Sequence, residues 1–255
     1  MKSSSIMRKY FPCLNHAKPM DAAHGGWLGW LNNMQKYLTL VKTLDIATHL
    51  RGFSTNVANY QQLGSKMCPY DETDGASGQN TYCLNRQHDE DECCDDPCAL
   101  EGQYNAGNTE LNYANLLYIN AINILEKEMK MIIDTGRNNP VDPSRKSCAN
   151  WCNIYRAGVG TPPPTSDTYN NTVLDAYYWL KTPGESDGCS AATNVTECPR
   201  HDEMCNSADS ICKGCNPLIP DMPDAPSAGN WFDYGMYQLV INGQGGETAK
   251  LESMP

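Results

Sequence analysis

The chain has 255 residues, a formal net charge of −11 and 13 cysteines. This length allows one large domain or two small ones, and the apolar fraction of 40% is ordinary for a globular protein. The negative charge argues against a nucleic-acid partner, because phosphate binding requires clustered Lys and Arg.

The first twenty residues show no periodic pattern. They carry positive charge, but no apolar core of signal-peptide length follows. No stretch of the chain is long enough to cross a bilayer, so we expect no membrane partner. The cysteines nevertheless indicate a secreted protein. A chain that lacks its true beginning would reconcile the two observations.

The first half of the chain predicts two helices and two short strands. Helices fit residues 32–44 and 109–130, each with apolar side chains on one face. The expected buried residues are Met34, Tyr37, Leu38, Val41 and Leu44 in the first helix, and Leu111, Leu116, Ile119, Ile122 and Leu125 in the second. Strands fit residues 50–55 and 131–133. Residues 61–108 form a long Cys-rich insert, which would be an unusual loop in a compact domain without disulfides.

The second half predicts one more strand and a closing helix. Residues 173–180 are rich in aromatic and β-branched side chains and are followed by Pro183 and Gly184. A helix fits residues 226–241, with the inward side chains Trp231, Met236, Leu239 and Val240. The alternation of strands and helices indicates a parallel α/β fold whose βα loops carry the site. Three strands are too few for a closed barrel, which indicates a partial domain.

Three charged side chains follow the strand at residues 173–180, namely Lys181, Glu185 and Asp187. In an extended segment, residues two apart share a face, so both carboxylates would point the same way. Two neighbouring carboxylates resist ionising together, and a nearby cation offsets that effect. Such a group suits a hydroxyl-rich ligand or acid–base chemistry. The alternative is a solvated loop with an ordinary Lys–Glu pair.

The cysteines fall in patches, which favours disulfides in an oxidising compartment. A metal site is another interpretation of Cys212 and Cys215, but no second pair of matching spacing and no His follows them. We therefore expect no metal and no cofactor. Sequons at Asn170 and Asn194 also fit a secreted glycoprotein. The acidic run at residues 88–92 predicts a solvated face, with a calcium site as the alternative.

Seven motifs occur together in the order in which a known family has them. They are residues 21–30 (DAAHGGWLGW), 51–60 (RGFSTNVANY), 134–138 (DTGRN), 151–153 (WCN), 175–181 (DAYYWLK), 184–188 (GESDG) and 228–232 (AGNWF). As a set they resemble glycoside hydrolase family 6, the cellobiohydrolases and endoglucanases that cut β-1,4-glucan. The resemblance implies the C-terminal half of a distorted parallel (β/α) barrel with a cleft or tunnel across its top. The expected domain is residues 21–245, preceded by a non-family segment at 1–20 and followed by a tail at 246–255.

The resemblance also implies a role for individual residues. Asp187 matches the family's proposed catalytic base, which acts on water. The residues that match substrate contacts are Asp21, His24, Trp27, Trp30, Asn59, Trp151, Lys181 and Glu185. Cys152 and Cys205 match a family disulfide. Without the resemblance, Trp27 and Trp30 would be core residues, His24 a structural histidine, and Asp187 an N-cap or surface acid.

The implied reaction is hydrolysis of β-1,4-glucosidic bonds in cellulose or another β-glucan with inversion, by a secreted and monomeric enzyme. The long Cys-rich loop between Asp187 and Trp231 favours exo action over endo action, because a loop that disulfides constrain can cover a cleft. The family's catalytic acid lies upstream of Asp21, and residues 1–20 contain no Asp. The alternatives are a non-catalytic carbohydrate-binding remnant of the family and a Cys-rich structural or metal-binding protein.

Overall fold

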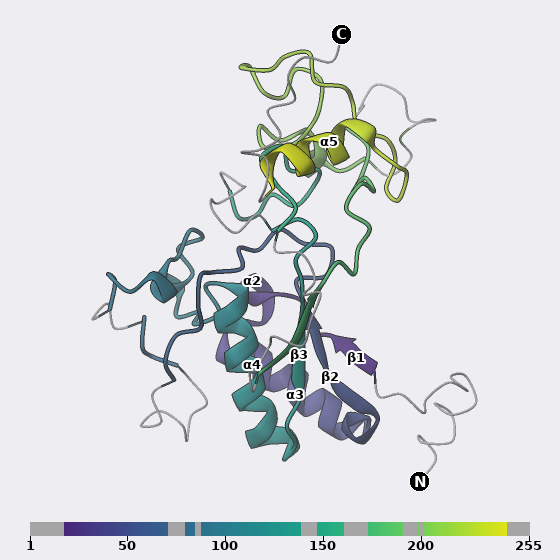
Figure 1. The fold of residues 1–255 in the computed structure, drawn as a ribbon. Coiled ribbons are helices and arrows are strands. Elements are labelled where there is room, and N and C mark those ends of the chain that lie inside the picture. Colours follow the sequence, from purple (N-terminus) through teal and green to yellow (C-terminus); the bar gives the residue numbers. More distant parts are fainter. Residues whose placement is uncertain are drawn as a thin grey trace, which may run out of the picture. The chain divides into compact units, whose positions relative to one another are not determined.

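The structure is a computed structural model that describes residues 18–70, 80–84, 88–138, 147–160, 173–190, 198 and 201–243. The chain divides into two compact units, which are described separately (Figure 1). The first unit comprises Met1–Val57, Leu63–Ile133 and Pro163–Tyr177. The second unit comprises Ala58–Gln62, Asp134–Pro162 and Tyr178–Pro255. Both predicted sequons lie outside the described residues.

The first unit is built on a four-stranded sheet in the order β1-β2-β3-β4. The strands are β1 (Lys18–Asp21), β2 (Leu50–Thr55), β3 (Lys130–Asp134) and β4 (Leu174–Tyr178). β1 and β3 both pair with β2 in parallel, with Phe53 opposite Met20 on one side and opposite Met131 on the other. The predicted parallel α/β architecture is therefore confirmed, while closure into a barrel stays a prediction.

Strand β1 was not expected from the sequence, because Lys18 and Pro19 do not read as a buried strand. In the described sheet β1 pairs only with β2 and lies at an edge. An edge strand tolerates a proline and charged side chains, since one side of its backbone makes no ladder bonds.

Two long helices cover the sheet of the first unit and pack against each other (Figure 1). Helix α3 (Leu31–Thr43) buries Met34, Leu38 and Val41, as predicted. Thr109 is the N-cap of helix α4 (Glu110–Leu125), and its hydroxyl accepts a hydrogen bond from the Asn112 N–H at 3.3 Å. The core joins these faces to fully buried residues of the strands, namely Phe53, Met131 and Ile133.

Leu44 and Ile122 are exposed, contrary to prediction. Leu44 follows the end of α3. Ile122 lies on the outer side of the last turn of α4, where Ala121 is buried and Ile124 and Leu125 pack against the core. Helix α4 also ends earlier than predicted, because Glu126 adopts the left-handed conformation with φ 57° and terminates the helix.

Disulfides order the Cys-rich insert, as predicted. Cys68 pairs with Cys93, and Cys83 pairs with Cys94. Asn112 of α4 holds this cluster: its amide accepts from the Cys68 N–H at 2.8 Å and donates to the Cys93 carbonyl at 2.7 Å. The described part of the insert contains two 3₁₀ turns, η3 (Glu92–Cys94) and η4 (Glu101–Gln103), and these disulfides and hydrogen bonds hold it in place. His88, Asp89, Glu90 and Glu92 are exposed, which agrees with the predicted solvated face.

The second unit has little regular structure in its described part. It contains the short η5 (Glu203–Asn206), α5 (Asp233–Asn242) and two isolated antiparallel bridges. Disulfides join Cys152 to Cys205, Cys189 to Cys198, and Cys212 to Cys215. The first is the pair that the resemblance implies. The third replaces the metal interpretation of Cys212 and Cys215.

Helix α5 begins seven residues later than the expected start at 226, since residues 227–230 form a turn. Trp231 therefore precedes the helix and is exposed, and Val240 on the outer face of α5 is exposed as well. Leu239 is buried, as predicted. Among the described residues, no helix combines the length and the apolar character needed to cross a membrane.

Candidate functional site

Asp187 is the centre of a hydrogen-bonded cluster in the second unit. Arg137 Nη1 contacts both carboxylate oxygens of Asp187, at 2.6 Å and 2.8 Å. The Tyr60 hydroxyl donates to Oδ2 at 2.5 Å, and the backbone N–H of Asn153 donates to the same oxygen at 3.0 Å. The Asp187 side chain is only 8% exposed. This burial excludes the surface-acid interpretation of Asp187, and the four contacts supply the hydrogen-bond partners that a buried polar group requires.

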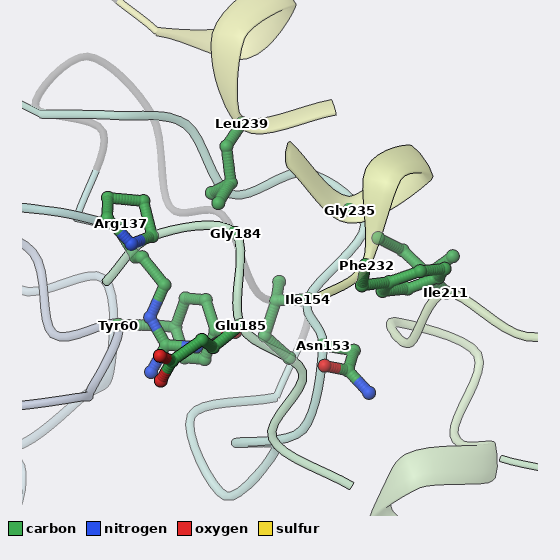
Figure 2. A pocket seen from close by; sticks show the side chains of 11 residues that line it. Tyr60, Arg137, Asn153, Ile154, Gly184, Glu185, Ile211, Phe232, Gly235 and Leu239 are labelled. Atoms are coloured by element: carbon green, nitrogen blue, oxygen red, sulfur yellow. The ribbon is translucent and has the colours of Figure 1, made fainter. Parts of the chain in front are cut away.

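Arg137 is the buried cation of this cluster. Its guanidinium lies 4.2 Å from the centre of the Tyr60 ring, donates to the Tyr60 hydroxyl at 2.7 Å, and donates to the Ala58 carbonyl. Burial alone would lower the pKa of Arg137, but Tyr60 and Asp187 raise it, so the guanidinium stays charged. Figure 2 shows Arg137 and Tyr60 together with Glu185 nearby.

Tyr60 remains a neutral hydrogen-bond donor to Asp187. Burial raises the pKa of the Tyr60 phenol, while Arg137 lowers it and Asp187 raises it again. The net direction is upward. The phenol therefore keeps its proton across the neutral range and donates a hydrogen bond to the Asp187 carboxylate.

Asp134 joins three segments of the second unit around this cluster. Its Oδ2 accepts hydrogen bonds from the backbone N–H of Ala58 at 3.2 Å and of Lys181 at 3.0 Å. Its Oδ1 accepts from the Gly136 N–H at 2.9 Å. These contacts fix the start of the segment that carries Lys181 and the loop that precedes Tyr60.

Lys181 approaches both carboxylates that the sequence pattern grouped with it. Its Nζ lies 3.6 Å from Glu185 Oε2 and 3.9 Å from Asp187 Oδ1. The segment is a turn and not an extended strand, so the grouping results from this turn and not from strand alternation. The Glu185 side chain is 39% exposed, whereas the Asp187 side chain is only 8% exposed. The solvated-loop alternative therefore describes Glu185 and fails for Asp187.

Trp151 and Asn59 flank the cluster along the chain. Trp151 precedes Cys152 and is 41% exposed, so it is not a core residue. Asn59 precedes Tyr60, and its Nδ2 atom is buried and has no hydrogen-bond partner among the described residues. Both side chains belong to the second unit, together with Lys181, Glu185 and Asp187.

A small hollow lies beside the cluster, with a volume of about 20 Å³ (Figure 2). Its lining includes Tyr60, Arg137, Asn153, Glu185 and Phe232. That space suffices for about one water molecule, and the polar lining supplies hydrogen-bond partners for it.

The other predicted contacts lie in the first unit, close together in sequence. Asp21 is exposed at the end of β1. His24 caps the one-turn helix α2 (Gly25–Leu28): its Nδ1 accepts from the Gly26 N–H at 3.1 Å, which leaves the proton of a neutral ring on Nε2. Buried Glu110 accepts from the Gly25 N–H at 2.8 Å and fixes this turn.

The two tryptophans of the first unit differ in their surroundings. The Trp27 ring is 69% exposed and lies 5.2 Å from the His24 ring, which excludes a core role. The Trp30 indole N–H donates to the Gln103 carbonyl in the insert at 2.9 Å. Trp30 is therefore held by the insert.

Three residues that hold Asp187 were not singled out from the sequence. They are Tyr60, Arg137 and Asn153, and each lies within one of the seven motifs. Their membership in those motifs was the available signal. Nothing in local spacing shows that groups of residues 34 to 127 positions away from Asp187 meet at its carboxylate.

The family model of glycosyl hydrolases family 6 matches residues 13–243. The chain belongs to this family. The probable 1,4-beta-D-glucan cellobiohydrolase C of Aspergillus terreus is 29% identical over 94% of this chain and 44% of its own length. A putative endoglucanase type B of Fusarium oxysporum is 30% identical over 88% of this chain and 39% of its own length.

Solved structures of family 6 enzymes are also similar to this chain. CcCel6C, a glycoside hydrolase family 6 enzyme from Coprinopsis cinerea, is similar with a TM-score of 0.62 and 29% identity, over 89% of this chain and 51% of that chain. Cellobiohydrolase II from Humicola insolens, in complex with glucose and cellotetraose, has a TM-score of 0.64 and 26% identity, over 95% and 57%. The chain spans about half the length of these relatives.

Proposed function

We propose that this chain takes part in the hydrolysis of β-1,4-glucosidic bonds in cellulose or a related β-glucan, with inversion. The observation that carries the proposal is the buried Asp187 carboxylate, held by Arg137, Tyr60 and Asn153 in a member of this hydrolase family. The Aspergillus relatives carry the name cellobiohydrolase, and one similar structure contains a p-nitrophenyl cellotrioside.

In this proposal Asp187 is the base that activates water. Lys181, Glu185 and Asn59 bind sugar hydroxyls, and Trp151 stacks on a pyranose face. From the first unit, Asp21, His24, Trp27 and Trp30 serve as further substrate contacts. An inverting mechanism also needs an acid on the leaving oxygen, with the two carboxyl groups roughly 6.5–9.5 Å apart to admit the water. The family resemblance assigns that acid to a position upstream of Asp21.

We further propose exo action with release of cellobiose, by a secreted monomer with a roofed cleft in a barrel. Support comes from the segment after Asp187, which three disulfides hold, and from the cellobiohydrolase names of the relatives. The Fusarium oxysporum relative is called an endoglucanase, so endo action is the alternative. Digestion of carboxymethylcellulose separates the two modes, because endo action lowers viscosity rapidly and exo action releases cellobiose with slow viscosity loss.

A second candidate function is carbohydrate binding without hydrolysis. The observation that favours it is the number of donors on Asp187: both carboxylate oxygens contact Arg137, and Oδ2 also accepts from Tyr60 and Asn153. Because the Asp187 side chain is only 8% exposed, these contacts leave little of its carboxylate open to a water molecule.

Both candidates predict slow or no hydrolysis of cellohexaose by the chain alone, because general acid catalysis is worth roughly 10²–10⁴-fold and residues 1–20 contain no Asp. A fusion that supplies the acid separates them, since only the hydrolase candidate predicts turnover by the fusion. Fusion to the upstream half of a family 6 relative is expected to restore turnover, with the α-anomer as the first product by NMR. The Asp187→Asn variant of that fusion is expected to bind cellohexaose and lose turnover. Full turnover by this variant would assign the base to another group.

A further inference from the structure

We propose that Trp231 is an additional platform on which a glucan pyranose stacks, beside Glu185 in the second unit. The inference rests on the proposed function and extends it to a residue that the sequence pattern assigned to the core. Trp231 is 55% exposed, although indole is among the largest apolar side chains.

The backbone around Trp231 pairs with the segment that carries Glu185. Trp231 and Glu185 form an antiparallel bridge. The Phe232 N–H donates to the Gly184 carbonyl at 2.9 Å, and the Ser186 N–H donates to the Asn230 carbonyl at 2.9 Å. Trp231 is therefore fixed next to the Lys181–Asp187 turn, independently of any contact of its ring.

The indole ring is itself held in one orientation. A Cβ atom placed on Gly184 would lie 2.2 Å from Trp231 Cζ3 and 2.3 Å from Cη2, so the ring rests directly on the glycine backbone. At the other end of the ring, Nε1 donates to Asp233 Oδ1 at 2.7 Å. The ring is thus supported by Gly184 and oriented by Asp233, while more than half of the residue remains open to solvent. A fixed ring loses little entropy when a ligand stacks on it.

The polar groups around Trp231 indicate which ligand suits this ring. Glu185 is partly exposed, and Lys181 lies 3.6 Å from it, so a carboxylate and an ammonium are available near the ring. A pyranose presents an apolar face to an aromatic ring and a rim of hydroxyls to such groups. The carboxylates of Glu185 and Asp233 disfavour an anionic ligand. The surface thus matches a neutral sugar.

The test is calorimetric titration of cellohexaose into the wild-type chain and its variants. Trp231→Ala is expected to weaken binding about tenfold, and Trp231→Tyr to restore most of it. Gly184→Ala is expected to weaken binding as well, because the added methyl displaces the ring. Tyr237→Ala is the matched control, since Tyr237 is a similarly exposed aromatic residue on α5. In the wild-type chain, the indole ¹⁵N–¹H signal of Trp231 is expected to shift with cellohexaose, a readout that needs no variant to fold.

The outcomes separate this inference from the proposed function. Normal binding by Trp231→Ala, with an unmoved Trp231 signal and weakened binding by Trp151→Ala, would overturn the role of Trp231 alone. Weakened binding by Trp231→Ala together with a shifted signal supports it, whatever Trp151→Ala does. A wild-type chain that binds no cellohexaose would contradict both the proposed function and this inference.

Discussion

Asn153 and Asp187 hold each other by two reciprocal hydrogen bonds. The Asn153 N–H donates to Asp187 Oδ2 at 3.0 Å, and the Asp187 N–H donates to Asn153 Oδ1 at 2.8 Å. The Asn153 amide also donates to the Gly188 carbonyl at 2.7 Å. Asn153 adopts a left-handed conformation with φ 46°, which Asn tolerates better than most residues. One asparagine therefore fixes the position of both the backbone and the carboxylate of Asp187.

Replacing Asn153 tests this arrangement. Asn153→Ala is expected to lower the free energy of unfolding by about 2–4 kcal/mol, because it leaves buried groups without partners and puts Ala at a positive φ. Asn153→Gly removes the same side-chain bonds without the strain, and is expected to cost about 1 kcal/mol less. Urea denaturation measures both values. An Asn153→Ala variant as stable as the wild type would show that the hydrogen bonds of the Asn153 side chain contribute nothing.

Two Arg–Asp pairs among the described residues offer a matched comparison of buried and exposed ion pairs. Arg137 and its partner Asp187 are 3% and 8% exposed, whereas Arg51 is 61% exposed beside Asp175. Arg137→Met is expected to cost about 3–5 kcal/mol of unfolding free energy, since it leaves a buried carboxylate uncompensated. Arg51→Met is expected to cost at most about 1 kcal/mol. Similar losses in both variants, from urea denaturation, would contradict the buried role of Arg137.

The disulfide between Cys152 and Cys205 closes a loop with a sequence separation of 53 residues. In the chain-entropy model a loop of this size contributes about 4 kcal/mol. The double variant with Ala at both positions is expected to lose about that much unfolding free energy. Removing Cys212 and Cys215, which are 3 residues apart, is expected to cost about 2 kcal/mol or less. Peptide mapping without reductant checks the pairing, and a free thiol at position 152 or 205 would contradict it.

Buried tyrosines predict loss of stability at alkaline pH. Burial raises the pKa of Tyr60, and burial also raises the pKa of Tyr113. An unfolded tyrosine titrates near about pH 10, so the unfolded chain loses protons above that pH while the folded chain keeps them. The contribution of these tyrosines to the free energy of unfolding is therefore expected to keep its whole value below about pH 10. Above that pH it is expected to fall, by up to about 1.4 kcal/mol per pH unit for each such tyrosine.

Tyr60→Phe tests that pH dependence. Between pH 8 and about pH 11, this variant is expected to lose less stability than the wild type. Tyr104→Phe, at an exposed position, is expected to follow the wild type. Urea denaturation at the two pH values gives the comparison. Equal alkaline losses in the wild type and Tyr60→Phe would contradict the shift at Tyr60.

The sequence predicted those features that local patterns determine. The buried faces of α3 and α4 follow from a period of 3.6 residues, and the turn at Pro183 and Gly184 follows from that Pro-Gly pair. The end of α4 was missed because Glu126, and not glycine, adopts the left-handed cap. Strand β1 was missed because Lys18 and Pro19 are tolerated only at a sheet edge, which is a property of the assembled sheet.

The cluster around Asp187 could be predicted only in part. Lys181, Glu185 and Asp187 are close in sequence, so their grouping was visible. Tyr60 and Arg137 reach Asp187 from segments that are 127 and 50 residues away. Such contacts depend on tertiary folding, which residue spacing does not encode. Trp231 was assigned to the core from its apolar character, yet its ring is oriented by Gly184 and Asp233 while remaining exposed.

The most direct test of the central claim is calorimetric titration of the wild-type chain with cellohexaose and, separately, with maltohexaose. The two ligands have the same sugar units and differ in the anomeric configuration of their links. If Trp151 and the Lys181–Asp187 turn form a site for β-1,4-glucan, cellohexaose is expected to bind and maltohexaose to bind at least tenfold more weakly, about 1.4 kcal/mol. Equal affinity for the two ligands, or no heat of binding with cellohexaose, would contradict the account.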